Sequence, residues 1–477
     1  MASGSRRFTR CAAVTGGVAL LLGALLAAAS GCRPVQRISA QHFPDVTLTP
    51  QDRLLVLAPH PDDETLCCGG LIQQAVRTGV PVRVVFFTNG DNNEWSFFVY
   101  RKHPVLFPRA VRGMGQVRHE EALAAVKLLG LSPNQVTFLG YPDFGTLYIW
   151  KRHWGDRPAY RSMLTRATAV PYASALRPGA PHKGEEVLHD LTTVLREFRP
   201  TKVFVSHPAD KMPDHAALYL FTRVALWDLE RELPSPELYP YLVHFKHWPH
   251  PKGLRKEALL EPPQKFQEAI PWRSHPLTPA EVEWKLKALK THRTQYTVSA
   301  KYLLSFIRMN ELFGDFLPVR LGGGREAAFS SEDPDHEPEA LEELTDVERA
   351  AFVGVETRSV QLDGKDVVVS IGFSRPLAQA VEASVYIFGY RADRPFATMP
   401  KLHVKTGTLT SVVYDQDRVV AADTVRVGRR FKQLTIRVPL DALGQPQKIF
   451  TSARTHLSEV PLDGVSWRIF DVGGGQG

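Results

Sequence analysis

Residues 53–220 alternate short apolar runs with segments of helical periodicity, and this alternation constrains the fold more than any other feature of the sequence. The predicted strands span 54–58, 82–88, 136–139 and 202–206. The predicted helices span 65–78, 116–129 and 185–198. Strands and helices that alternate at these lengths form an open, mostly parallel sheet with helices on both faces. We therefore expect a Rossmann-like α/β domain.

The pattern changes after residue 346. Apolar and polar residues then alternate with a period of two in short runs separated by turns, and no convincing helix stands between them. The clearest of these runs are 367–371, 383–390 and 434–438. Such a pattern is typical of a β-sandwich, which we expect over 347–472. Residues 322–346 are rich in glycine and acidic residues and predict a flexible linker, so the α/β domain would span 51–321.

The N-terminal residues have the pattern of a bacterial export signal. A basic stretch precedes the uncharged run 12–29, and Ala-Ser-Gly-Cys follows at 29–32. This ending resembles a lipobox, in which the cysteine is acylated and becomes the first residue of the mature protein. We expect a signal peptide at 1–31, a lipid anchor on Cys32 and a tether over 32–50. The protein would then belong to the bacterial cell envelope, facing the periplasm or the exterior. An uncleaved transmembrane helix is the alternative, since the run is about long enough to cross a bilayer.

Charge and cysteine content exclude two classes of protein. The formal net charge is +8, but no dense block of Lys and Arg with interleaved aromatic residues occurs, so we expect no nucleic-acid partner. Of the four cysteines, Cys11 and Cys32 lie in the export region, while Cys67 and Cys68 are adjacent. The chain therefore has no disulfide framework. We expect the adjacent pair in the core, with metal ligation as the alternative.

Imidazole and carboxylate side chains follow two of the predicted strands. Residues 59–64 read Pro-His-Pro-Asp-Asp-Glu, and residues 207–215 contain two His and two Asp. Because parallel strands of an open sheet end at the same edge, these groups can meet there. Two imidazoles and one carboxylate with a free fourth position suit catalytic zinc, and a remaining carboxylate can accept a proton from water. An ordinary helix N-terminus is the alternative for Asp63 and Glu64, but it does not explain His60.

On these motifs the chain resembles the PIG-L/LmbE family of zinc-dependent N-deacetylases. The family shares the strand-end motif found here at 59–64 and a later Pro-Asp-His, found here at 213–215. Weaker matches lie at 88–91, Arg118, Glu121, 129–130, 140–143, Lys287 and 292–295. The resemblance extends over 53–307 and does not include the predicted sandwich.

The resemblance implies a role for each residue that matches a motif. His60, Asp63 and His215 would hold zinc, and such a donor set also accepts other divalent metals. Asp62 would be the general base that activates water and returns the proton to the leaving amine. Asp214 would orient a ring in the site, that of His215, as outer carboxylates do.

Further positions carry expectations of their own. Arg118 and Asp143 resemble residues that contact sugar hydroxyls or phosphate of the substrate; the alternatives are a surface cation and a turn residue. Many family members have a carbonyl-polarising histidine where this chain has Met212, which cannot donate a hydrogen bond. Either His207 replaces that histidine or zinc alone suffices, and capping of its own loop is the alternative for His207. We expect the remaining histidines of this region to pack at the rim: His244, His247, His250 and His275.

The sequence thus predicts an envelope-tethered hydrolase that removes an N-acyl group, most often acetyl, from an amino sugar or glycoconjugate. Its partners would be this substrate, zinc and the membrane. Aromatic residues at 95–100 could stack on a sugar ring or pack in the core. A zinc amidase acting on non-sugar N-acyl compounds is the nearest alternative. A glycan-binding lipoprotein with a weakened hydrolase domain is another, because sandwich domains often carry carbohydrate sites.

Overall fold

The computed structural model of the 477-residue chain describes most of the sequence after residue 42. The described residues are 43–92, 107–322, 328–332, 344–377, 380–421 and 423–473. The predicted signal peptide, Cys32 and the aromatic residues at 95–100 lie outside these ranges, as do most of the predicted tether and linker. Within the described ranges, no helix combines the length and the apolar character needed to span a membrane.

A five-stranded parallel sheet forms the centre of the N-terminal part, with the strand order β3-β2-β1-β4-β5. Its strands are β1 (Leu54–Ala58), β2 (Val82–Thr88), β3 (Val136–Tyr141), β4 (Lys202–Ser206) and β5 (Glu237–Tyr241). The order runs outward from β1 through β2 to β3, and on the other side through β4 to β5. The reversal places a switch point between β1 and β4, and open α/β sheets bind their ligands at the carboxyl ends of such strands.

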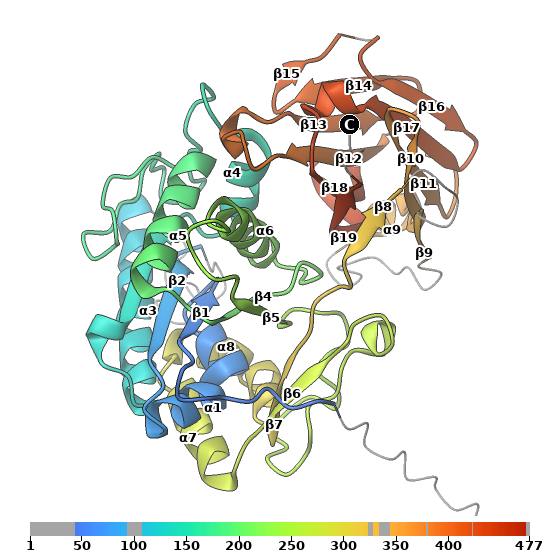
Figure 1. Cartoon of the computed structure of the whole chain (residues 1–477). Coiled ribbons are helices and arrows are strands. Elements are labelled where there is room, and N and C mark those ends of the chain that lie inside the picture. The colour runs from blue at the N-terminus through green and yellow to red at the C-terminus, as the bar shows by residue number, and fades with distance from the viewer. Residues whose placement is uncertain are drawn as a thin grey trace, which may run out of the picture. The chain divides into compact units, whose positions relative to one another are not determined.

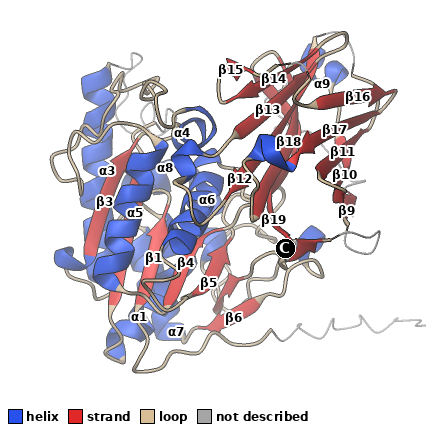
Figure 2. Ribbon diagram, turned by 45° about the horizontal axis from the view of Figure 1, so that its top comes forward, coloured by secondary structure: helices blue, strands red, loops and turns tan. Residues whose placement is uncertain are grey.

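Helices cover both faces of this sheet, and Figure 2 shows its strands between them. The helices are α1 (Asp63–Arg77), α3 (Pro108–Leu128), α4 (Thr146–Arg152), α5 (Gly184–Phe198), α6 (Pro213–Asp228), α7 (Pro279–Leu289) and α8 (Arg293–Leu303). Side chains alternate along β1: Leu54, Val56 and Ala58 join the core under α1, α3 and α7, while Leu55 and Leu57 join the core under α4, α5 and α6. The predicted Rossmann-like α/β class is confirmed.

Strand β5 is not among the strands predicted from the sequence. The proline at position 240 argues against a central strand, but β5 is at the edge of the sheet, where a missing N–H is tolerated. A small antiparallel pair, β6 (Arg273–Pro276) with β7 (Asn310–Phe313), follows. Short 3-10 helices complete the described connections at Pro133–Gln135, Gln264–Phe266, Leu304–Phe306, Phe396–Thr398 and Leu440–Leu443.

The C-terminal part contains two sheets around one apolar core, as Figure 1 shows in orange and red. One has the order β15-β14-β13-β12-β18-β19-β8 and the other β16-β17-β11-β10-β9. Their strands are β8 (Val319–Leu321), β9 (Phe329–Glu332), β10 (Val355–Asp363), β11 (Asp366–Phe373), β12 (Val381–Tyr390), β13 (Lys401–Thr406), β14 (Ser411–Asp415), β15 (Arg418–Val419), β16 (Arg426–Arg430), β17 (Gln433–Pro439), β18 (Lys448–Leu457) and β19 (Val460–Val472). The pairs are antiparallel except β19 with β8. This is the predicted β-sandwich.

Two local features of this part differ from the sequence prediction. Strand β9 lies inside the predicted linker and pairs with β10, so these four residues are not free chain. A short helix, α9 (Asp346–Ala351), begins after Thr345, whose hydroxyl accepts a hydrogen bond from the amide of Glu348 at 3.3 Å. Thr345 and Glu348 form a capping box, a local signal that the strand pattern further along had obscured.

The outer face of β12 carries a second aromatic cluster, separate from the sandwich core. The ring of Phe388 lies 6.0 Å from that of Trp150 in α4, and the ring of Phe450 lies 5.4 Å from it. Trp467 packs against both Phe388 and Trp150. These aromatic side chains pack with residues of the α/β part.

Candidate metal centre

Two loops meet at the switch point between β1 and β4. The first leaves β1 at Ala58 and enters α1 at Asp63; the second leaves β4 at Ser206 and enters α6 at Pro213. Proline suits the first helical position because its fixed φ is preorganised for a helix and its missing N–H is not needed there. The local structure therefore brings the side chains of both predicted motifs to the same edge of the sheet.

Three donor atoms from these loops form a triangle. The distances are 3.2 Å from His60 Nδ1 to His215 Nε2, 3.3 Å from His215 Nε2 to Asp63 Oδ2, and 3.5 Å from His60 Nδ1 to Asp63 Oδ2. Ligands bound tetrahedrally to zinc at 2.0–2.1 Å lie about 3.3 Å apart, so the triangle has the size of one face of such a shell. All three side chains are buried. The fourth position of a tetrahedron would be left for another ligand.

The far nitrogens of both imidazoles face carboxylates. His60 Nε2 lies 3.0 Å from Asp143 Oδ1 and 3.2 Å from Asp214 Oδ2, and His215 Nδ1 lies 3.1 Å from Asp210 Oδ2. Protons on these far nitrogens leave lone pairs on the near nitrogens, pointing toward the carboxylate of Asp63. Three acceptors then converge. Asp63 Oδ2 also accepts from the backbone amide of His60 at 2.9 Å, and a metal cation would satisfy the remaining lone pairs.

Neighbouring charges shift the pKa values of the residues in the triangle. Burial lowers the pKa of His215, but the charges of Asp210 and Asp63 raise it overall to about 9. Burial also opposes the charge on Asp63, yet the imidazolium of His215 holds the pKa of this carboxyl well below its usual value. The pocket thus stabilises positive charge between buried carboxylates, which favours a cation.

Asp214 does not have the partner that the sequence suggested. Its carboxylate faces His60 and accepts hydrogen bonds from the backbone amides of Phe144 at 2.6 Å and Thr146 at 3.2 Å. The expectation that it orients His215 is wrong, because successive residues of a helix point about 100° apart. Asp210, which lies in the loop before α6, takes that position instead.

Asp143 is likewise an outer carboxylate. It is buried, one oxygen faces His60 and the other accepts from the amide of Asn92 at 3.1 Å. Burial raises its pKa, but the positive charge of His60 and its hydrogen bond lower it to about 2. The structure therefore places Asp143 against His60, and its contact with substrate stays a prediction.

Asp62 stands beside the triangle in a strained backbone conformation. It precedes α1 with φ of 132°, and its amide donates to Glu64 Oε2 at 3.0 Å. Such a φ is costly outside glycine and persists where surrounding contacts enforce it. Burial raises the pKa of Asp62 to about 7, against the opposing charge of Arg118. This carboxyl can therefore exchange a proton near neutral pH.

Arg118 supports this loop from within the protein. Its terminal nitrogens donate to the carbonyl oxygens of Gly90 at 2.9 Å and Pro61 at 2.8 Å, and one lies 3.6 Å from Asp62 Oδ1. A side chain at position 90 would collide with the guanidinium, at 2.1 Å from Nη1, so glycine is required there. Arg118 is buried, which excludes the surface cation, and it supports the loop that carries Asp62. Its contact with substrate stays a prediction.

The weaker sequence matches form a layer behind the site. His292 Nε2 lies 3.1 Å from Glu64 Oε1, the partner oxygen of the one that holds Asp62. The carboxylate of Glu121 accepts from the amide of Thr294 at 3.1 Å and from its hydroxyl at 2.6 Å. These contacts tie α3 and the start of α8 to the loop after β1, so the motifs around these residues serve the same site.

His207 lies outside the cluster. Its ring is fully buried, lies 4.7 Å from that of Phe316, and its Nδ1 accepts from the amide of Ala209 at 3.0 Å. Burial lowers the pKa of His207 to about 3, so the ring stays neutral. The expectation that it replaces the missing carbonyl-polarising group is wrong; it caps its own loop, as the alternative held.

His244 reaches the cluster although it was expected to pack at the rim. Its ring centre lies 5.0 Å from that of His215, with the two planes at 76°. The residue follows β5, and its backbone amide donates to Asp210 Oδ2 at 2.9 Å. No spacing rule points to it; recognising β5 as a strand would have placed it at the same sheet edge.

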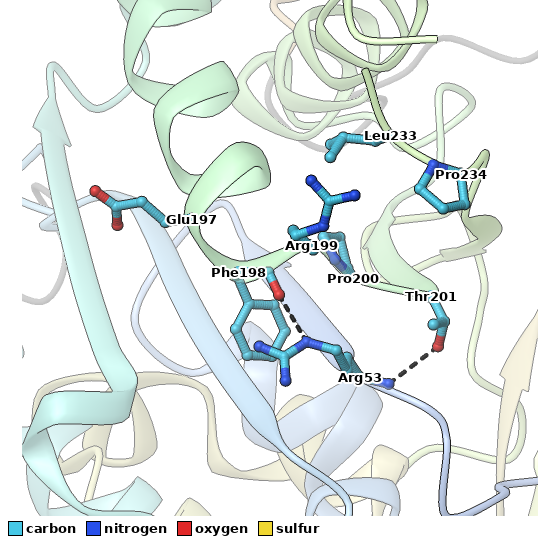
Figure 3. Close-up of a pocket in the computed structure, with 8 residues that line it drawn as sticks. All are labelled: Arg53, Glu197, Phe198, Arg199, Pro200, Thr201, Leu233 and Pro234. Carbon is cyan, nitrogen blue, oxygen red and sulfur yellow. Dashed lines mark hydrogen bonds between the residues drawn. The ribbon is translucent and has the colours of Figure 1, made fainter. Parts of the chain in front are cut away.

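A separate cavity of about 340 Å³ lies away from these residues. Figure 3 shows its lining, in which Arg53 donates to the carbonyl of Phe198 at 2.7 Å. Arg53 and Thr201 directly precede β1 and β4, so the cavity is at the amino edge of the sheet. The metal cluster is at the carboxyl edge, and the cavity takes no part in it.

Comparisons with known proteins match the part of the chain that holds the cluster. The PIG-L family, described as GlcNAc-PI de-N-acetylase, matches residues 55–226. A 1D-myo-inositol 2-acetamido-2-deoxy-alpha-D-glucopyranoside deacetylase 1 of Saccharopolyspora erythraea is 32% identical, with 38% of this chain and 55% of the relative covered. The corresponding deacetylase of Gordonia bronchialis is 28% identical, with 55% and 91% covered.

The chain thus spans about half the length of the first of these relatives. Among solved structures, N,N'-diacetylchitobiose deacetylase of Pyrococcus horikoshii is 20% identical and has a TM-score of 0.32, with 53% of this chain and 75% of that chain covered.

Proposed function

Residues 55–226 form a domain of the PIG-L family, and on this premise we propose that the protein is a zinc-dependent hydrolase that removes an N-acetyl group from an amino sugar or glycoconjugate. The observation that carries the proposal is the triangle of His60, Asp63 and His215 with Asp62 beside it. Two relatives named as deacetylases of an acetamido sugar support the substrate class. Other divalent metals suit the same donors, and zinc is proposed because the spacing fits a tetrahedral shell.

The metal and the surrounding residues have separate roles in the reaction. When bound, zinc supplies a Lewis acid that polarises the amide and eases deprotonation of water. Asp62 accepts a proton from the water whose oxygen bonds to the carbonyl carbon. The same carboxyl then returns this proton to the amine nitrogen as the C–N bond breaks, which leaves acetate and a free amino sugar. Arg118 and Glu64 hold Asp62 in place throughout.

The outer carboxylates keep the imidazoles ready to bind the metal. The far nitrogen of His60 forms a hydrogen bond with Asp214 at 3.2 Å and lies 3.0 Å from Asp143 Oδ1, and that of His215 lies 3.1 Å from Asp210 Oδ2. Each fixes the tautomer and the direction of its ring. The intact set of donors and the base favour deacetylation over a glycan-binding protein with a weakened hydrolase domain.

The decisive experiment measures metal content and amine release together on the protein beginning after Cys32. A panel of N-acetylated sugars and non-sugar N-acetyl amides serves as substrates. We expect near-stoichiometric zinc, amine release from a sugar, and a loss of about 10²- to 10⁴-fold in Asp62→Asn with zinc retained. Asp346→Asn, whose side chain is 96% exposed, is the matched control and should behave as wild type. Absence of metal, or full activity in Asp62→Asn, would contradict the proposal.

We further propose that a lipid on Cys32 anchors the protein in the bacterial cell envelope. The support is the small residues before this cysteine and the apolar run that precedes them. Cys32→Ala should move the protein from the membrane fraction to the soluble fraction if the signal is still cleaved, or leave an intact signal peptide detectable by mass spectrometry. An unmodified cysteine in the membrane-bound wild type would exclude the anchor.

A further inference from the structure

Amide hydrolysis places negative charge on the carbonyl oxygen, and a hydrogen-bond donor aimed at that oxygen is worth a large factor in rate. The residues assigned so far do not offer one. Asp62 is the base, and the near atoms of His60, Asp63 and His215 face the metal position. The terminal nitrogens of Arg118 already donate to carbonyl oxygens.

The loop before α6 does not provide the donor either. Met212 stands directly before the helix, and its thioether has no proton to donate. His207 is fully buried among aromatic rings, and its Nδ1 already accepts from Ala209. A side chain that assists the metal by donating to this oxygen would therefore come from another element.

His244 is the imidazole that reaches the triangle from outside this loop. Its ring meets that of His215 edge to face, with centres 5.0 Å apart and planes at 76°. The side chain is half-buried, whereas those of His207 and His215 are fully buried, so a ligand can reach it. Among the described residues, none forms a hydrogen bond with its ring nitrogens, which leaves them available to a substrate.

Contacts on both sides hold this ring in place. Asp210 Oδ2 accepts from the amides of His244 and Val243, both at 2.9 Å, and also faces the ring of His215. The amide of Lys211 donates to the carbonyl of His244 at 2.9 Å. On the other side the ring stacks on that of Tyr302, 5.9 Å away and inclined by 18°, and the Tyr302 hydroxyl donates to Val243 at 2.7 Å. A donor fixed in this way needs little reorganisation during reaction.

We propose that His244 is a catalytic residue whose ring N–H donates a hydrogen bond to the carbonyl oxygen of the scissile amide. The bond strengthens as water adds to the carbonyl carbon and the oxygen gains charge. The proton stays on His244, while the proton of the water travels through Asp62 to the amine. The inference rests on the proposed function and adds to it the group that stabilises the developing charge.

Two substitutions test the donor. In His244→Ala, kcat should fall about 100-fold, while KM and the bound zinc change little. His244→Gln keeps an N–H donor and should recover part of this loss. His189→Ala is the matched control, because the His189 side chain is 59% exposed and lies on α5, and it should retain wild-type rates.

A binding measurement separates a catalytic role from a structural one. The methylphosphonamidate of glucosamine imitates the tetrahedral state of the reaction, so His244→Ala should weaken its binding by about the same factor as kcat. Binding of the product glucosamine should be unchanged in the same variant.

Three results would contradict the inference. Unchanged kcat and unchanged binding of the phosphonamidate in His244→Ala would exclude the donor while leaving the proposed deacetylase intact. Loss of zinc in His244→Ala would make the residue a support of the metal site instead. Failure of the zinc-loaded wild type to release amine from any acetylated sugar would remove the proposed function, and the inference with it.

Discussion

Two pairs of histidines in the described part of the protein differ in what lies between them. At the edge of the parallel sheet, nitrogens of His60 and His215 face each other at 3.2 Å beside a carboxylate. In the sandwich, His403 Nε2 and His456 Nε2 both face the hydroxyl of Ser384, at 2.9 and 3.0 Å. A hydroxyl can donate to one imidazole and accept from the other, so the second pair is satisfied without an ion. The convergence of acceptors, rather than the number of histidines, distinguishes a metal site.

The charges around the two pairs also differ: carboxylates surround the first pair and cations lie near the second. Burial opposes a proton on His60, but the charge of Asp143 and further carboxylates raise its pKa well above the usual value. Burial, together with the cations Arg152 and Lys151, lowers the pKa of His403 to about 3. The first environment attracts a cation and the second repels one.

Asp63→Ala should produce the largest effect, because it removes one corner of the triangle and the carboxylate next to both imidazoles. We expect loss of bound zinc and amine release no faster than the uncatalysed reaction. Metal analysis after gel filtration measures the first result and an amine assay the second. Asp346→Ala is the matched control. Full zinc content in Asp63→Ala would show that the triangle is not the metal site.

Asp210→Asn should have a smaller effect on the same pair. The amide oxygen can still accept from the backbone of Val243, but the charge that faces His215 is lost. Loss of such an outer carboxylate typically weakens metal binding by 10- to 100-fold. Competition with a chelator measures this affinity. Asp143→Asn should also weaken zinc binding, through His60. An unchanged zinc affinity in both variants would show that these carboxylates do not contribute to metal binding.

The positions of the metal-facing residues could be predicted because topology alone brings them together. Any parallel sheet with strands at 54–58 and 202–206 as neighbours opens both following loops on one edge, so His60, Asp63 and His215 converge whatever the details. The alternation of short strands with helical segments likewise predicted helices on both faces.

The partners of these residues could not be predicted, because they depend on direction rather than proximity. Asp210 lies in the loop before α6 and Asp214 in the first turn of this helix, and only the local backbone direction decides which imidazole each one faces. Arg118 and Asp143 were recognised as site residues, but their contacts with Asp62 and His60 were not. His244 was missed because the strand before it, β5, contains a proline and does not show strand periodicity.

The pH dependence of stability should reveal the neutral histidine of the sandwich. His403 has a folded-state pKa of about 3 against about 6.5 when unfolded, so between these values the unfolded chain binds the extra proton. This contribution is complete above pH 6.5 and is lost as the pH falls, by about 1.4 kcal/mol per unit, or roughly 2 kcal/mol at pH 5. Urea unfolding at pH 7 and pH 5 should show a smaller loss in His403→Gln than in wild type. An equal loss would mean that His403 titrates normally.

Ser384→Ala should have the smallest effect and tests the comparison most directly. The substitution removes the hydroxyl that joins the two sandwich imidazoles, and a lost hydrogen bond of this kind costs about 1 kcal/mol. Because no cation is needed between these rings, zinc content and amine release should equal those of wild type. Thermal unfolding measures the stability, and metal analysis of the same sample measures the zinc. If Ser384→Ala lowered the zinc content, the sandwich pair would also bind metal, and the contrast between satisfied and converging histidines would fail.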